Sequence, residues 1–179
     1  MTAEWLPKIL SGLLNNFLLM FLSSIIPAGI GIGLTLLMKS VGTKGIRLTF
    51  RIIGAVFYSM APIVLLLYLY FFVAVQIGLS ILIIVLALTI PHLGWFAMFF
   101  DAEASAAKNI VVNTLGLLSS TFMWSMVSNF IGYRDIVGVS NYIRGMTYNV
   151  SSLLIVLLIT VIILAALNVP RMILKEKMK

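Results

Sequence analysis

The stretch that decides the fold runs from Ile52 to Phe100 and reads IIGAVFYSMAPIVLLLYLYFFVAVQIGLSILIIVLALTIPHLGWFAMFF. It contains no Asp, Glu, Lys or Arg. As a single helix its roughly 49 residues would extend about 73 Å, whereas the hydrocarbon core of a bilayer is about 30 Å thick. The chain must therefore fold back on itself, and we expect the turn at Val75–Ser80, where Gln, Gly and Ser cluster.

Three further uncharged runs, residues 9–38, 109–133 and 145–170, are each long enough for one crossing. The hydrophobic content of 62% and the charged content of 9% exclude a water-soluble globule, in which about 25% of residues are charged. We therefore predict an all-α integral membrane protein with a single transmembrane domain, residues 1–179. Its five helices are expected over residues 9–38, 51–74, 78–100, 108–131 and 149–170.

The distribution of Lys and Arg predicts the orientation of these helices. In the five-helix arrangement one side carries nine basic residues: Lys39, Lys44, Arg47, Arg51, Lys108, Arg171, Lys175, Lys177 and Lys179. The other side carries Lys8, Arg134 and Arg144. The positive-inside rule then places the N-terminus outside and the C-terminus in the cytoplasm. The net charge of +7 is thereby explained by topology, so nucleic acid is not expected as a partner.

The sequence offers little enzyme chemistry. It has no cysteine, no phosphate-binding Gly-rich motif and no cluster of metal ligands, so we expect no catalytic residue, metal or cofactor on this chain. The single histidine, His92, lies within a predicted span, where it is either a packing side chain or a proton carrier. Asp101 and Glu103 follow that span and are interpreted as solvated loop carboxylates.

A polar face on the fourth predicted helix is more informative. Thr121, Ser125, Ser128 and Asn129 recur at helical spacing on one side of residues 108–131. In a bilayer such a face must point into protein or into a water-filled path. It either lines a route for a polar solute or forms hydrogen bonds between helices. Asn15 and Asn16 on the first helix carry the same two alternatives.

Two other segments have alternative interpretations. Gly29 and Gly33 share a small-residue face on the first helix, which suits either packing within the chain or a seam between chains. Residues 133–144 mix polar and apolar side chains with two tyrosines. This pattern predicts a short interfacial helix, or alternatively an outer gate or docking surface.

Several segments resemble the membrane (permease) subunits of ABC importers for polar amino acids. The similar segments are Trp5–Asn16, the Gly-rich run from Gly29 to Ser40, Phe57–Tyr70 with Pro62, Asn129–Val139, and the pair Pro170-Arg171. The resemblance implies a multi-pass protein of the bacterial inner membrane with a second permease subunit, two ATP-binding subunits and an extracytoplasmic solute-binding protein. ATP would bind at the partner subunits, and the solute pathway would be lined by Tyr58, Ser59, Thr121, Ser125 and Asn129.

The chain departs from this family in the connection between the third and fourth helices. The family has a long cytoplasmic coupling loop there, whereas this chain has only Asp101–Lys108. Asp101, Glu103, Ser105 and Lys108 would form a degenerate coupling loop, about 12 Å long if helical. A partner permease would then carry the full loop. The alternatives are a structural or regulatory subunit that kept the permease fold, and a small homo-oligomeric channel or carrier.

Overall fold

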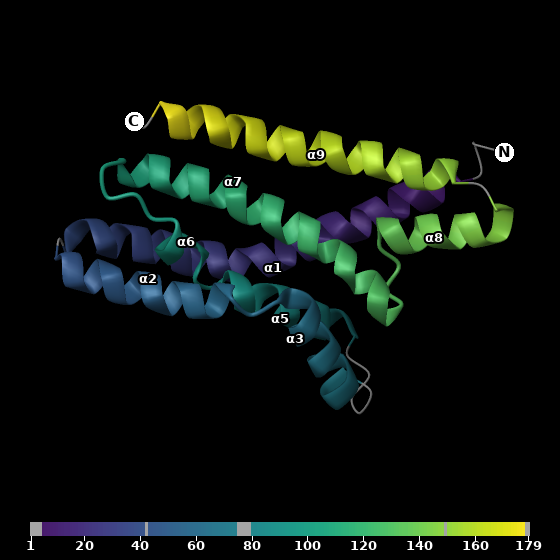
Figure 1. Ribbon diagram of the computed structural model, residues 1–179, viewed down its shortest axis with the longest axis horizontal. Coiled ribbons are helices and arrows are strands. Elements are labelled where there is room, and N and C mark those ends of the chain that lie inside the picture. Colours follow the sequence, from purple (N-terminus) through teal and green to yellow (C-terminus); the bar gives the residue numbers. More distant parts are fainter. Residues whose placement is uncertain (1–4, 42, 75–79, 149, 178–179) are drawn as a thin grey trace.

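The computed structural model describes residues 5–41, 43–74, 80–148 and 150–177, which form helices and short connections with no β-strand. Figure 1 shows long helices lying side by side along the longest axis of the molecule. The predicted all-α class is confirmed for these residues. The turn expected at Val75–Ser80 lies outside them, apart from Ser80, which begins a helix.

Ten helical elements follow one another along the described chain. They are α1 (Leu6–Ser40), α2 (Lys44–Tyr58), α3 (Pro62–Leu69), the π-helix η1 (Tyr70–Ala74), α5 (Ser80–His92), α6 (Trp95–Met98), α7 (Ala106–Ser125), the 3-10 helix η2 (Met126–Ile131), α8 (Ile136–Thr147) and α9 (Ser151–Glu176). Four helical segments are long and apolar enough to cross a membrane: α1, α5 with α6, α7 with η2, and α9. The α2 and α3 pair, bent by 57°, is the fifth candidate span.

Two of the predicted helices are interrupted. The helix expected over 51–74 ends at Tyr58 and resumes at Pro62, because proline cannot donate a backbone hydrogen bond but is favourable in the first turn of a new helix. The helix expected over 78–100 ends at His92, directly after Pro91, and continues after Gly94 as the single turn of α6. Both predicted spans are therefore broken near their middle or end.

Pro27, in contrast, is accommodated within one continuous helix of 35 residues. A proline in a helix leaves the carbonyl four residues earlier without its usual donor. Here that carbonyl belongs to Ser23, and it accepts a hydrogen bond from the Thr89 hydroxyl of α5 at 3.3 Å. A neighbouring helix thus satisfies the group that the proline leaves free, which is how interrupted hydrogen bonds are tolerated in membrane helices.

The buried apolar residues form three small clusters. One joins α1, α3 and α5 around Leu19, Leu66 and Ile84; another joins α1, α8 and α9 around Ile9 and Ile136. The third contains Trp95, Phe96 and Leu117. Most of the remaining apolar surface is exposed, above all on α9, whose buried residues are Ser152 and Val156. Apolar helices with exposed apolar faces are typical of a protein surrounded by lipid.

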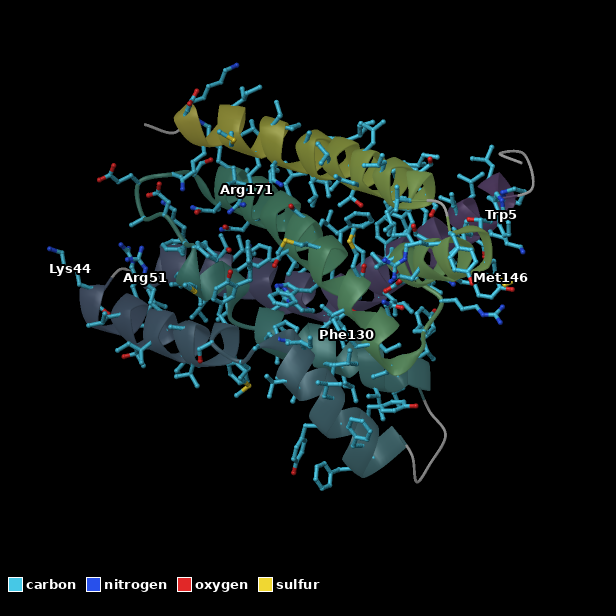
Figure 2. All side chains as sticks on the ribbon, turned by 45° about the vertical axis from the view of Figure 1, so that its right-hand side comes forward. Trp5, Lys44, Arg51, Phe130, Met146 and Arg171 are labelled. Atoms are coloured by element: carbon cyan, nitrogen blue, oxygen red, sulfur yellow. The ribbon has the colours of Figure 1, made fainter. Side chains whose placement is uncertain are left out.

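The two ends of the molecule differ in charge. Figure 2 shows Lys44, Arg51 and Arg171 toward one end, and Trp5 and Met146 at the other. Two more lysines form hydrogen bonds near the first end: the Lys39 Nζ atom donates to the carbonyl of Ala102, and the Lys108 Nζ atom donates to that of Lys177. α1 begins and α9 finishes at opposite ends (Figure 1). Which end faces the cytoplasm stays a prediction.

Candidate functional site

The two interrupted spans touch each other at two glycines. A Cβ atom built on Gly94, between α5 and α6, would lie 2.4 Å from the Gly54 Cα atom in α2. A Cβ atom on Gly54 would lie 2.7 Å from the Gly94 carbonyl oxygen. Only glycine permits this backbone contact. The contact brings the break after α2 close to the break after α5.

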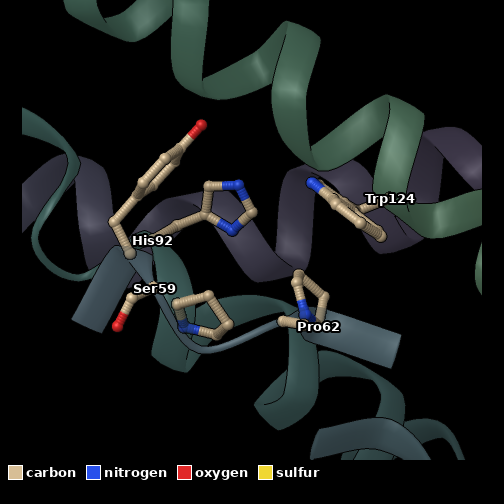
Figure 3. A pocket seen from close by; sticks show the side chains of 7 residues that line it. Ser59, Pro62, His92 and Trp124 are labelled. Carbon is tan, nitrogen blue, oxygen red and sulfur yellow. The ribbon is translucent and has the colours of Figure 1, made fainter. Parts of the chain in front are cut away.

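A cavity of about 240 Å³ lies beside these breaks. Its lining comes from α2, the bend after it, the start of α3, α5 and α7: Tyr58, Ser59, Ala61, Pro62, Pro91, His92 and Trp124. Figure 3 shows the rings of His92 and Trp124 on opposite sides of the space, while the Ser59 hydroxyl points away from it. Ser59 instead donates to the Val56 carbonyl at 2.7 Å. The volume is below the range of about 300–1,000 Å³ typical of drug-sized ligands, so the cavity suits a small solute.

His92 is the most polar side chain of this cavity, and it is 1% exposed. Its Nδ1 atom lies 2.6 Å from the Leu88 carbonyl oxygen, and its Nε2 atom lies 2.9 Å from the Ser120 hydroxyl. Because a carbonyl only accepts, Nδ1 carries the proton, and in the neutral ring Nε2 accepts from Ser120. No group of three His, Asp or Glu side chains within the described ranges could hold a metal ion.

Aromatic rings extend from the cavity toward the basic end of the molecule. Tyr58 packs edge-on against Trp95 at 5.6 Å and against Phe99 at 5.7 Å between ring centroids. The Arg171 guanidinium of α9 lies 5.6 Å from the Trp95 ring, within the range of a cation–π contact. The Trp95 Nε1 atom is buried without a hydrogen-bond partner in the described structure. Tyr58 therefore contributes to the cavity on one side and to this aromatic cluster on the other.

Four polar residues of α7 contact three different helices. Ser120 bonds to His92 of α5, Ser119 accepts from Asn168 of α9 at 2.7 Å, and Thr121 lies 2.9 Å from the Ser24 hydroxyl of α1. Ser125 accepts from the Asn16 side chain at 2.7 Å. Thr121 and Ser125, both predicted to line a pathway, are fully buried between α7 and α1. The structure does not bring them into the cavity that Tyr58 and Ser59 line.

Asn129, the third pathway residue predicted on the fourth helix, lines a separate and larger cavity near the start of α1. Its backbone N–H donates to the Asp135 carboxylate at 3.0 Å. Asp135 is completely buried and also accepts from the Ser128 hydroxyl and the Gly138 N–H. No role was expected for Asp135, although it caps α8 and an acidic residue just before a helix is an N-cap signal.

The residues expected to form a degenerate coupling loop make a short, well-bonded connection. Asp101 and Glu103 lie between α6 and α7, Ser105 caps α7 by accepting from the Lys108 N–H, and Lys108 already belongs to α7. The connection is held mainly by Asn109, whose side chain bonds the backbone of Asp101 in both directions. The Arg51 guanidinium also donates to the Phe100 carbonyl at 2.6 Å. Asn109 was missed because an asparagine near a helix start carries no specific signal.

The small-residue face on α1 differs from the sequence interpretation. Gly29 and Gly33 are exposed, and a Cβ atom on either would have no neighbour within 4 Å in the described structure. Close packing occurs at Gly31 instead, where a Cβ atom would lie 2.0 Å from the Phe96 ring. The glycine of this run that packs closely within the chain is therefore Gly31, and not Gly29 or Gly33. The alternative, a seam between chains at Gly29 and Gly33, stays a prediction.

Comparison of this chain with models of protein families, with curated proteins and with solved structures finds no match.

Proposed function

We propose that this chain is a membrane subunit of an ABC-type importer for amino acids or similar small polar solutes. It would pair with a second permease that carries a full coupling loop. ATP-binding subunits would act at the basic, cytoplasmic end, and a solute-binding protein would dock at the opposite end. The resemblance in sequence supports this proposal, and so does the presence of four to five apolar candidate spans.

The observation that carries the proposal is the pair of adjoining helix breaks beside one cavity. Transporters place their solute sites where spanning helices are interrupted, because the freed backbone groups and polar side chains there can bind a solute inside the membrane. Here Gly54 within α2 contacts Gly94 at the break after α5, and one cavity is lined by Ala61 from the break after α2 and by His92 from the end of α5. Tyr58 and Ser59, expected on the pathway, line the same cavity.

Purification of the tagged chain from its native membrane under mild detergent tests this proposal. We expect peptide mass spectrometry to detect an ATP-binding subunit and a second permease in stoichiometric amounts. The purified complex should support ATP-dependent uptake of radiolabelled amino acids in proteoliposomes. Isolation of the chain without a nucleotide-binding partner would contradict the proposal.

A matched pair of variants on one helix end tests whether the cavity is the solute route. Both positions are exposed, but Ala61→Leu places a larger side chain at the edge of the cavity, whereas Val64→Leu enlarges a side chain of α3 that does not line it. We expect Ala61→Leu to reduce uptake by about tenfold, equivalent to about 1.4 kcal/mol, with assembly intact. Val64→Leu should leave uptake unchanged. Equal uptake by both variants would place the route elsewhere.

A structural or regulatory subunit is the second candidate, and the connection between α6 and α7 favours it. This connection is bonded to three helices of the same chain: to α7 through Asn109, to α2 through Arg51 and to α1 through Lys39. In the described residues it contains no additional helix that could reach a motor subunit. If this candidate is correct, the complex assembles and transports normally when Ala61→Leu enlarges a side chain at the cavity. The chain alone should then show no flux in liposomes.

A further inference from the structure

The cavity that Asn129 lines lies at the opposite end of the molecule from Lys44 and Arg51. It has a volume of about 610 Å³ and is formed by the start of α1, the end of η2, the following turn and α8. Figure 2 shows Trp5 and Met146 at this end. The cavity is thus built where two chain segments distant in sequence converge, one within residues 7–15 and the other within residues 129–142.

Cationic and hydrogen-bonding side chains line this cavity. Lys8 and Arg134 contribute the cations, and Ser11, Asn15 and Asn129 contribute polar groups. None of the described residues that line it is acidic. The nearest carboxylate in sequence, Asp135, is fully buried and already accepts three hydrogen bonds. The cavity is therefore suited to an anion.

Contacts with aromatic rings place the Lys8 ammonium group within this region. The Nζ atom lies 4.7 Å from the Trp5 ring and 5.7 Å from the Tyr142 ring centroid. Asn15 donates to the Arg134 carbonyl at 2.7 Å, which fixes the backbone that carries the second cation. Two positive groups are thus supplied by α1 and by the turn before α8.

The surroundings of the cavity are apolar and exposed. Leu10 and Leu14 of α1, Phe130 of η2 and Tyr142 of α8 are each more than half exposed. Trp and Tyr beside exposed aliphatic residues are typical of the interface between membrane and water. At a membrane–water interface the most abundant anions are the phosphates of lipid head groups. Arg and Lys bind these phosphates by charge-assisted hydrogen bonds.

We propose that this cavity binds a phosphate group through Lys8 and Arg134, and that its source is an anionic phospholipid head group. This inference does not depend on whether the chain transports a solute. Inorganic phosphate shares the binding chemistry but lacks the acyl chains that would lie against Leu10, Leu14 and Phe130. The two sources can therefore be separated by experiment.

Native mass spectrometry of the purified full-length protein in detergent, titrated with phosphatidylglycerol, tests the proposal. We expect one lipid to bind tightly to the wild type, with weaker binding of phosphatidylcholine. Lys8→Gln and Arg134→Gln should each reduce the affinity by about fivefold, which corresponds to about 1 kcal/mol per cation at a membrane surface. The double variant should lose at least about tenfold.

Arg144→Gln is the matched control, because Arg144 is an exposed cation on α8 that does not line the cavity. It should bind phosphatidylglycerol as the wild type does, and circular dichroism should show that all variants are folded. Competition by millimolar inorganic phosphate would support phosphate recognition but assign it to a free anion. Equal lipid binding by the double variant and by Arg144→Gln, without competition by phosphate, would overturn the proposal.

Discussion

The Asp135 carboxylate joins the end of η2 to the start of α8. It accepts hydrogen bonds from the Ser128 hydroxyl at 2.9 Å, the Asn129 N–H at 3.0 Å and the Gly138 N–H at 2.6 Å. In Asp135→Asn an amide nitrogen replaces one accepting oxygen, so at least one buried donor loses its partner. We expect the free energy of unfolding to fall by about 1–2 kcal/mol, measured by thermal unfolding in detergent with circular dichroism.

The pH dependence of this difference has a definite sign. Burial raises the pKa of the Asp135 carboxyl above its ordinary value of 3.8, against the opposing effect of its hydrogen bonds to Gly138, Ser128 and Asn129. The folded state therefore binds the proton more tightly than the unfolded state. The carboxyl group's contribution to stability is complete below the unfolded pKa and is lost as the pH rises through the folded pKa. The free energy of unfolding of the wild type should therefore exceed that of Asp135→Asn by a growing margin as the pH falls from about 7 to about 4. A narrowing difference would refute this assignment.

Asn15 and Asn16 are neighbours in sequence but differ in burial and in the number of hydrogen bonds that they form. Asn16 is fully buried, donates to Ser125 at 2.7 Å and accepts from the Ile136 N–H at 2.8 Å, whereas Asn15 is partly exposed and makes one bond to the Arg134 carbonyl. Asn16→Leu leaves the buried Ile136 N–H unpaired and should cost about 2–4 kcal/mol. Asn15→Leu should cost less than about 1 kcal/mol. Equal losses of unfolding free energy in the two variants, measured by thermal unfolding, would contradict the assignment of the stronger contacts to Asn16.

The sequence could not separate these two asparagines, because both lie in an apolar helix and either could face a pathway or a partner helix. Asp135 shows the same limitation, since a carboxylate in a polar turn gives no sign that it will be buried. Burial of such groups depends on which helices pack together, and helical periodicity does not contain that information.

At the scale of the element, α2 offers a matched pair of glycines. Gly54 contacts the Gly94 backbone, whereas a Cβ atom on Gly45 would have no neighbour within 4 Å in the described structure. We expect Gly54→Ala to destabilise the protein by more than about 2 kcal/mol, because backbone atoms on both helices would have to move apart. Gly45→Ala should be neutral or stabilise it by up to about 1 kcal/mol through helix propensity. Thermal unfolding of the two variants measures the contrast, and similar stabilities would show that α2 and the break after α5 are not in contact.

The helical elements themselves were largely predictable, because uncharged runs of about 20 residues have few other stable structures in a membrane. The positions of the breaks were less so. Pro27 and Pro62 both occur inside apolar runs, yet α1 continues through the first and α2 ends before the second. Helix α1 can continue through Pro27 because the Thr89 hydroxyl of another helix donates to the Ser23 carbonyl, which the proline leaves without a donor. Similarly, the spacing of Gly29 and Gly33 indicates a shared face but not what lies against it.

At the scale of the whole molecule, orientation is the feature that charge predicts and geometry alone does not. Lys39, Arg51 and Lys108 bond to groups at one end of the helices, while Lys8 and Arg134 line a cavity at the other. The positive-inside rule assigns the first end to the cytoplasm. Since the chain has no cysteine, single cysteines can report the orientation without any background substitution.

Lys44→Cys and Arg144→Cys introduce one thiol at each end, on side chains that are exposed. With the membrane intact, a membrane-impermeant maleimide applied from outside should label Arg144→Cys and should label Lys44→Cys only after lysis. Denatured samples provide the full-labelling control for each variant. The reverse pattern would invert the orientation. Labelling of both thiols from the same side would instead mean that an even number of spans lies between Lys44 and Arg144. The bent pair of α2 and α3 would then not cross the membrane, which leaves α5 with α6 and α7 with η2 as the two crossings between the thiols. Because the proposed sites for ATP-binding subunits and for lipid phosphate lie at opposite ends, this result also decides on which face each must act.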